Sequence, residues 1–250
     1  MRTIKGKGME LDLLAIGAHP DDVELSCGGT IAKCVKLGYG VGILDLTEGE
    51  MGTRGSREIR TREAASAAKV LGVKVRESLS LPDGGFEVNR KSRLAVIKTI
   101  RKYRPKILLM PHWRERHPDH VRANTLCREA WFYSGLSKIE TTLAGKKQLP
   151  WRPHHYFHYM QTYEFTPSFI VDISDVYETR FEALKAFKSQ FYNPDSKEPA
   201  TFLSQKSFLD FMETRMKYYG QAIGTKYGEP FYSVHPVGIT DLFGMKMFKG

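Results

Sequence analysis

The sequence predicts an α/β fold in which a mostly parallel sheet carries helices on both of its faces. Short apolar runs alternate with longer amphipathic segments over the first 112 residues, and this βαβαβαβ order is typical of a parallel sheet. The 250 residues, 41% of them hydrophobic and 26% charged, have the composition of an ordinary globular protein. A chain of this length buries roughly 70–75% of its unfolded surface, so it needs no disulfides merely to fold.

The four predicted strands are apolar runs that end at polar or turn-forming residues. They cover residues 11–18, 41–47, 73–79 and 106–112. The predicted helices between them cover residues 29–37, 56–71 and 89–103. In the third helix Leu94, Ile97 and Ile100 recur every third residue, which places them on one apolar face.

The pattern is weaker after residue 136. The sequence indicates an exposed connection at residues 138–153, followed by two strands at residues 154–163 and 168–173. Two helices are expected at residues 175–191 and 202–220, and an irregular end at residues 221–250. Ser174 or Asp175 is the expected cap of the first of these helices. We expect one domain over residues 1–250. Residues 1–136 would form a core that carries the functional site, and residues 137–250 a C-terminal extension that completes the fold and supplies an oligomer interface.

Composition also bears on compartment and partners. Lys and Arg number 38 against 28 Asp and Glu, a net charge of +10 that suits a nucleic acid, a membrane surface or a small acidic substrate. No uncharged apolar run approaches the roughly 18 residues of a membrane span, and no recognised nucleic-acid motif occurs. We therefore expect neither partner, although the charge keeps a basic nucleic-acid-binding protein as a distant alternative. Three cysteines without a CxxC pair fit a reducing cytoplasm.

Polar residues follow each predicted strand of the core. The loops after the four strands span residues 19–22, 47–55, 81–85 and 112–120, and they are rich in titratable residues and glycine. Ligands of parallel sheets bind at the carboxyl ends of the strands. We therefore expect the four loops to open onto one crevice.

Two of these loops carry histidine and aspartate clusters, His-Pro-Asp-Asp at residues 19–22 and His-Pro-Asp-His at residues 117–120. A catalytic zinc takes three protein ligands from His, Asp and Glu and keeps a fourth position for water. His19, Asp22 and His120 would supply such a set. Two polar turns that cap helices are the alternative, but two clusters at one sheet edge favour a metal site.

The neighbouring glycines, Gly28 and Gly29, follow neither the GxGxxG nor the GxxxxGK[ST] pattern of a phosphate-binding loop. We predict that they allow close packing between a helix and a strand.

The AHPDD segment, the following glycine pair and the downstream HPDH resemble the zinc-dependent N-acetylglucosamine deacetylases of the PIG-L/LmbE-like family. The resemblance runs through the whole chain and implies a Rossmann-like sheet. Longer segments resemble one branch of the family, the bacillithiol-biosynthesis deacetylases, which remove acetyl from N-acetylglucosaminyl malate. These segments are TEGEMGTRG, REIRTREA, LPDGG, RERHPDH, SQFYNP and YYGQAIGTKYGEPF.

The resemblance implies a role for each matching residue. It implies one zinc per chain held by His19, Asp22 and His120, a site that iron, cobalt or manganese would also fit. It implies that Asp21 is the general base, that His117 assists charge development on the substrate, and that Asp119 orients His117. It also implies that Arg60 and Asp83 hold sugar hydroxyls. Some relatives have a polarising tyrosine where this chain has Glu115.

The resemblance also bears on substrate and assembly. A malate aglycone, the group attached to the sugar, carries two carboxylates, which arginine binds well. Arg54 and Arg57, in or beside the second crevice loop, are the candidates, unless they are solvated surface charges or Arg57 pairs along its helix. Glu63 is expected in a structural ion pair. The alternatives are the same chemistry on free N-acetylglucosamine, a chitin fragment or a thiol conjugate. Relatives imply a homo-oligomer, a trimer or hexamer.

Overall fold

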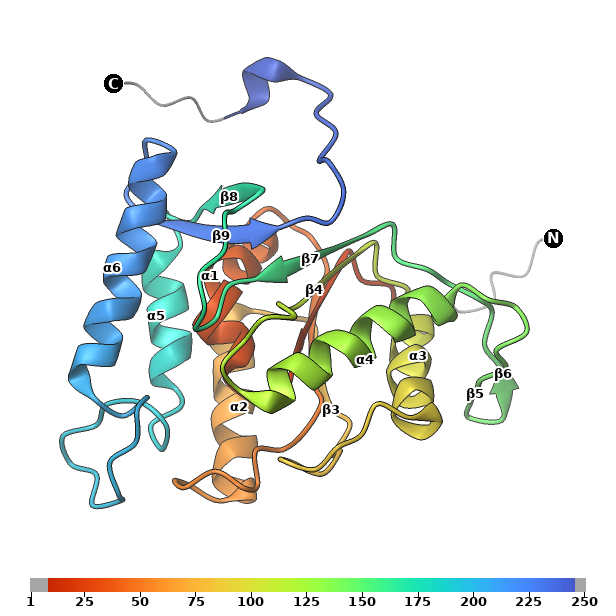
Figure 1. Ribbon diagram of the computed structural model, residues 1–250, viewed down its shortest axis with the longest axis horizontal. Helices are drawn as coiled ribbons and strands as arrows, with labels where there is room; N and C mark the ends of the chain where they lie inside the picture. The colour runs from red at the N-terminus through yellow and green to blue at the C-terminus, as the bar shows by residue number, and fades with distance from the viewer. Residues whose placement is uncertain (1–8, 246–250) are drawn as a thin grey trace.

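The computed structural model describes residues 9–245. Within them a seven-stranded sheet has the order β3-β2-β1-β4-β7-β9-β8, and β5 and β6 form a separate small hairpin. Figure 1 shows the sheet enclosed by helices. The strands are β1 (Leu13–Gly17), β2 (Val41–Asp45), β3 (Val75–Ser78), β4 (Ile107–Pro111), β5 (Thr142–Leu143), β6 (Lys146–Lys147), β7 (His155–Tyr159), β8 (Phe169–Asp172) and β9 (Gly228–Tyr232). The helices are α1 (Asp22–Lys36), α2 (Arg57–Leu71), α3 (Arg90–Tyr103), α4 (Pro118–Ser134), α5 (Tyr177–Lys185), α6 (Lys206–Ala222) and the short η1 (Leu242–Gly244).

The sheet is mostly parallel. Strand β1 pairs in parallel with β2 and β4, β2 with β3, and β4 with β7. Strand β9 is antiparallel to both of its neighbours, β7 and β8. The predicted fold class is therefore confirmed, and the three strands contributed by residues after 136 extend the same sheet.

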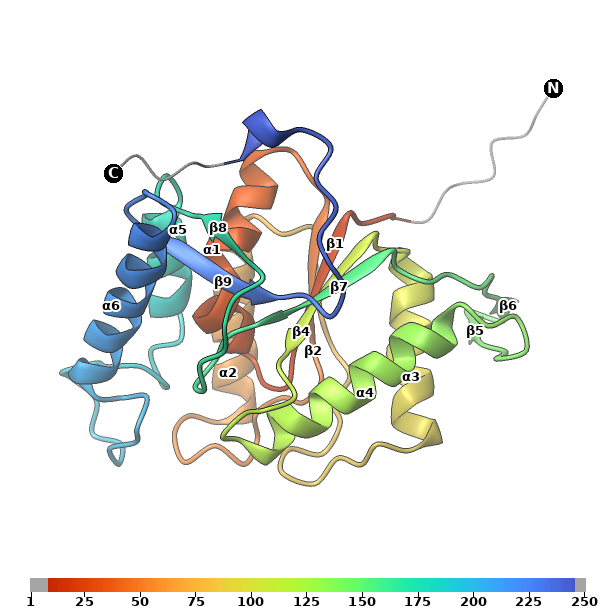
Figure 2. The same ribbon diagram turned by 45° about the horizontal axis from the view of Figure 1, so that its top comes forward.

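Successive side chains of a buried strand point to opposite faces of the sheet, so the core is divided into two layers. In β1, Leu13 and Ala15 pack with α1, α2, α5 and α6 on one face, whereas Leu14 and Ile16 pack with α3 and α4 on the other. Figure 2 shows these two groups of helices on opposite sides of the sheet. A strand covered on both faces has to be apolar on both, which explains the unbroken apolar run of β1.

Several elements differ from the sequence prediction. Helix α1 begins at Asp22, seven residues before its predicted start at Gly29. Helix α4 was not anticipated, because its buried side chains include the small Ala123 and Ala130, which make a weak apolar stripe. Strand β9 lies in the segment expected to be irregular, since Gly228 and Pro230 are poor strand formers. Helix α5 is shorter than expected and begins after Val176 without a side-chain cap.

The other expected features of the C-terminal half also changed in detail. The connection at residues 138–153 contains the β5–β6 hairpin. Asp175, an expected cap, pairs instead with Lys33 and Lys36 of α1. No helix within residues 9–245 is both long enough and apolar enough to cross a membrane.

A buried ion pair joins the C-terminal half to α1. The Glu229 carboxylate accepts hydrogen bonds from the backbone N–H groups of Gly29 (2.8 Å) and Thr30 (2.6 Å) and from Nε of Arg180 (3.1 Å). The side chains of Arg180 and Glu229 are 1% and 0% exposed. Close approach of β9 and of Ile173 to α1 depends on the lack of a side chain at Gly29.

We expect Gly29→Ala to destabilise the protein. A Cβ atom at this position would lie 2.7 Å from Cδ1 of Ile173 and 2.9 Å from Oε1 of Glu229, and overpacking of this kind costs about 1–3 kcal/mol. The free energy of unfolding from urea denaturation measures the effect. Gly238→Ala is the matched control because nothing lies within 4 Å of a Cβ there. Equal unfolding midpoints for the two variants would contradict the packing argument.

Candidate active site

The candidate site lies where the order of the strands reverses. The chain runs from β1 outward to β3 and then returns to place β4 on the other side of β1, and ligands of such sheets bind at this switch point. The loops that follow β1, β2, β3 and β4 all line one cavity of about 230 Å³. The prediction that these loops share a crevice is confirmed.

Three histidines converge in this cavity. The ring centroids of His19 and His117 are 4.8 Å apart, those of His19 and His120 are 5.3 Å apart, and those of His117 and His120 are 5.0 Å apart. Asp22 lies among them, with Oδ1 3.1 Å from Nε2 of His120 and Oδ2 3.6 Å from Nδ1 of His19. The structure therefore brings together all three residues predicted as zinc ligands.

The donor set fits a divalent cation. Nδ1 of His120 is buried without a hydrogen-bond partner, which is costly for a polar atom unless something binds it. Nε2 of His19 is also buried and faces the carboxylates of Asp83 (3.1 Å) and Asp119 (3.5 Å). Ligand atoms of His19, His117 and His120 lie within 4.8 Å of one another, as do those of His19, Asp83 and Asp119. Imidazole nitrogens and carboxylate oxygens are the donors that zinc takes in catalytic sites.

Asp21 is held in a strained conformation at the start of α1. Its φ of 122° is a conformation that costs a non-glycine residue roughly 1–3 kcal/mol and is frequent at functional sites. Burial raises the pKa of Asp21 to about 7, against the opposing effect of the positive charge on Arg60. The carboxyl group is thus placed beside the histidine cluster at a cost in backbone strain.

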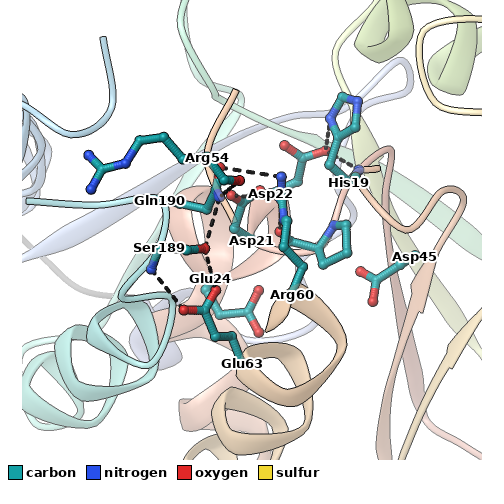
Figure 3. A network of polar contacts seen from close by, with 12 residues as sticks. His19, Asp21, Asp22, Glu24, Asp45, Arg54, Arg60, Glu63, Ser189 and Gln190 are labelled. Atoms are coloured by element: carbon teal, nitrogen blue, oxygen red, sulfur yellow. Dashed lines mark hydrogen bonds and ion pairs between the residues drawn. The ribbon is translucent and has the colours of Figure 1, made fainter. Parts of the chain in front are cut away.

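Arg60 fixes the position of Asp21, as Figure 3 shows. Its Nη2 lies 3.0 Å from Oδ2 of Asp21 and also donates to the carbonyl of Pro20, while Nη1 donates to Oε1 of Gln190 at 3.3 Å. A Cβ at Gly49, where φ is +68°, would lie 2.6 Å from Cζ of Arg60, so a glycine is needed there. Arg60 lines the cavity, and its expected contact with sugar hydroxyls stays a prediction.

The Asp119 carboxylate does not orient His117 in this structure. It accepts hydrogen bonds from the backbone of Gly84 (2.8 Å) and from Nη1 of Arg122 (2.6 Å), and it lies 3.5 Å from Nε2 of His19. Its link to His117 is through the backbone, whose N–H donates to Nδ1 of His117 at 3.2 Å. The expected carboxylate–imidazole pair is therefore replaced by a contact with the neighbouring histidine.

His117 caps the start of α4 by accepting that backbone hydrogen bond. Burial and the adjacent rings of His19 and His120 lower its pKa. Because Nδ1 accepts this hydrogen bond, Nε2 is the ring nitrogen left to carry a proton and to donate a hydrogen bond.

Asp83 and Glu115 are both tied to backbone groups. Oδ2 of Asp83 accepts from the N–H of Met51 at 2.9 Å, and Oδ1 lies 3.1 Å from Nε2 of His19. Glu115 accepts from the backbone of Arg116 (2.6 Å) and Thr162 (2.8 Å). Glu115 therefore joins two loops at the position where some relatives have a tyrosine, whereas Asp83 faces the cavity as predicted.

Arg54 lies behind the cavity rather than in it. Its guanidinium bonds the Ser196 hydroxyl and lies 3.7 Å from Glu198, and its side chain is 4% exposed. Arg57 pairs with Glu48 at the surface. Neither is a free cation for a substrate carboxylate, because Ser196 and Glu198 engage Arg54 and Glu48 engages Arg57. Glu63, expected in an ion pair, instead accepts two hydrogen bonds from Ser189.

Sequence reasoning missed the contribution of the C-terminal half to the site. Gln161 is 4% exposed, lines the cavity and donates from Nε2 to Oδ1 of Asp22 at 3.0 Å. It comes two residues after the end of β7, so the rule about carboxyl ends of parallel strands, applied to β7, would have found it. The C-terminal half also supplies an apolar wall of the cavity, which no sequence pattern indicated. The wall consists of Phe202, Leu203, Phe208 and Phe211.

A parallel sheet with a buried histidine–aspartate cluster at its switch point is the arrangement of a metal-dependent hydrolase. Comparison with known proteins agrees with this class. The profile of the family described as PIG-L, GlcNAc-PI de-N-acetylase, matches residues 14–131. Diacetylchitobiose deacetylase of Thermococcus kodakarensis is 34% identical over 229 residues, which cover 87% of this chain and 80% of that protein.

Solved structures are similar over nearly the whole chain. A conserved protein of Thermus thermophilus superposes with a TM-score of 0.82 at 37% identity, over 93% of this chain and 98% of the other. N,N'-diacetylchitobiose deacetylase of Pyrococcus horikoshii superposes with a TM-score of 0.75 at 30% identity, over 92% of this chain and 88% of the other. The chain belongs to the PIG-L family of deacetylases, hydrolases that act on acetamide bonds.

Proposed function

We propose that this protein hydrolyses the acetamide of an N-acetylglucosaminyl conjugate to acetate and the free amino sugar, and that the conjugate is N-acetylglucosaminyl malate, an intermediate of bacillithiol biosynthesis. The observation that carries the proposal is the convergence of three histidines and Asp22 beside the strained Asp21. The relatives named as diacetylchitobiose deacetylases support an N-acetylglucosamine sugar. The six segments from TEGEMGTRG to YYGQAIGTKYGEPF support the malate branch.

In this proposal His19, Asp22 and His120 would hold a zinc ion. Zinc supplies a Lewis acid that polarises the acetamide carbonyl and lowers the pKa of water from about 15.7 toward 7. The remaining groups of the site are side chains of the protein. They would transfer the proton of the attacking water and stabilise the negative charge that develops on the substrate oxygen.

Asp21 would accept the proton of the attacking water and pass it to the leaving amine as the C–N bond breaks. A general base of this kind contributes about 10²–10⁴-fold to the rate. Arg60 holds the Asp21 carboxylate in place at 3.0 Å. His117 would donate a hydrogen bond to the oxygen on which negative charge develops.

Gln161 gives the proposed metal site a test that does not depend on turnover. Its amide orients Asp22 through the 3.0 Å hydrogen bond to Oδ1, and loss of such a supporting contact typically costs about 10–100-fold in metal affinity. We expect Gln161→Leu to weaken zinc binding by about that factor, measured by competition with a chelating dye.

Gln148→Leu is the matched control for this experiment. Gln148 is also a buried amide, but it donates to the carbonyl of Lys98 and lies outside the cavity lining. Wild-type zinc affinity in Gln161→Leu would show that Asp22 does not depend on this contact.

A side-by-side assay of amine release tests the substrate. N-acetylglucosaminyl malate, free N-acetylglucosamine and diacetylchitobiose would be offered at equal concentrations. The proposal predicts a strong preference for the malate conjugate. Preference for diacetylchitobiose would favour the activity named for the relatives in Thermococcus and Pyrococcus and would overturn the malate assignment. Failure to release amine from all three would count against the proposed function as a whole.

A further inference from the structure

An arginine without a carboxylate partner stands at the rim of the cavity. Arg116 is exposed and lines the cavity beside the histidine cluster. Within residues 9–245 no Asp or Glu forms an ion pair with its guanidinium, which lies over the ring of Phe202 with Cζ 5.2 Å from the centroid. It directly precedes His117, so its backbone is fixed next to the reacting groups.

The other arginines near the site are already engaged. Arg60 bonds Asp21, Pro20 and Gln190. Arg54 lies behind the cavity, where Ser196 and Glu198 hold it. Arg116 is therefore the cavity-lining arginine in the described part of the chain whose charge is free for a ligand.

The side chains that line the cavity differ between its inner end and its solvent side. Asp21, Asp22 and Asp83 lie at its inner end. Phe202 and Phe211, 51% and 45% exposed, line it together with Arg116 on the solvent side. A neutral sugar with its acetamide suits the inner end, where the carboxylate of Asp21 already pairs with Arg60. A negative group suits the rim, because a planar guanidinium binds a carboxylate through two parallel hydrogen bonds.

We infer that Arg116 is a specificity-determining residue that binds a carboxylate on the substituent attached to the sugar. The inference rests on the proposed function and deepens it, because it assigns the residue that selects an anionic aglycone. The Phe202 ring supports the guanidinium from one side. Phe211, which also lines the cavity, offers an apolar surface for the carbon chain of that substituent.

The test compares two glycosides of the same sugar. One is N-acetylglucosaminyl malate and the other is the neutral methyl N-acetylglucosaminide. We expect Arg116→Gln to lower the ratio of kcat/KM for the malate glycoside to kcat/KM for the methyl glycoside by roughly 10- to 100-fold, the range for a charge-assisted hydrogen bond. The loss should lie mainly in KM. Arg116→Lys should fall between wild type and Arg116→Gln, since an ammonium keeps the charge and loses the paired geometry.

Arg114→Gln is the matched control. Arg114 is exposed on the same loop and lies over an aromatic ring, that of Tyr163, with Cζ 5.8 Å from the centroid, but it does not line the cavity. It should keep the wild-type ratio. An unchanged ratio in Arg116→Gln, or a wild-type ratio near one, would overturn the inference and leave the deacetylase function standing. No amine release from either glycoside by the wild type would instead overturn the proposed function.

Discussion

Replacement of Asp21 by asparagine should remove most of the turnover and leave the metal in place. Asparagine keeps the shape of the side chain and tolerates positive φ better than most residues, but it cannot accept the proton of the attacking water. The expected loss in kcat is about 10²–10⁴-fold. Amine release measures kcat, and metal analysis of the same sample measures the metal content per chain.

A second variant separates proton transfer from metal binding. His120→Ala removes an imidazole whose Nε2 lies 3.1 Å from Asp22, so it should lose the metal as well as the activity. Asp21→Ala should behave like Asp21→Asn in activity, with added strain because alanine has to adopt φ of 122°. A metal-loaded Asp21→Asn protein with near-normal turnover would show that Asp21 is not the base.

Of the substitutions proposed for this protein, removal of the Glu229 carboxylate should cause the largest loss in the free energy of unfolding. In Glu229→Ala the buried guanidinium of Arg180 would lose its partner, and Gly29 and Thr30 would lose acceptors for their backbone N–H groups. Breaking one side of a buried ion pair costs about 3–5 kcal/mol. The free energy of unfolding from denaturant titration measures this loss.

Glu140 provides the control for that experiment. Its ion pair with Lys147 is exposed on both sides, and exposed pairs contribute little, so Glu140→Ala should unfold at the wild-type midpoint. A loss below about 1 kcal/mol in Glu229→Ala would mean that the pair is no more important than a surface pair.

The sequence was sufficient to predict the sheet of the first half and the crevice above it. Strands β1, β2 and β4 are buried on both faces, so their apolar runs are unbroken, and the residues that follow them are polar because they face the cavity. The same rule placed His19 and His120 at one edge of the sheet, although they lie far apart in the sequence.

Contacts between distant segments were beyond sequence reasoning. Arg54 could be seen as a basic residue in a crevice loop, but its partner Glu198 comes from the other half of the chain. Asp119 was expected to face His117, whereas the packing of the third and fourth loops turns it toward Gly84 and His19. Strand β9 was hidden for a similar reason, because it is stabilised by its two neighbours rather than by its own composition.

The central claim is that the histidine–aspartate cluster holds a catalytic metal. The most direct test measures metal content and amine release on the same purified protein, before and after a chelator and again after zinc is restored. We expect about one metal per chain, loss of turnover with the chelator and recovery with zinc. Turnover that persists in a protein shown to be free of metal would contradict the claim, as would a chain that binds no metal after reconstitution.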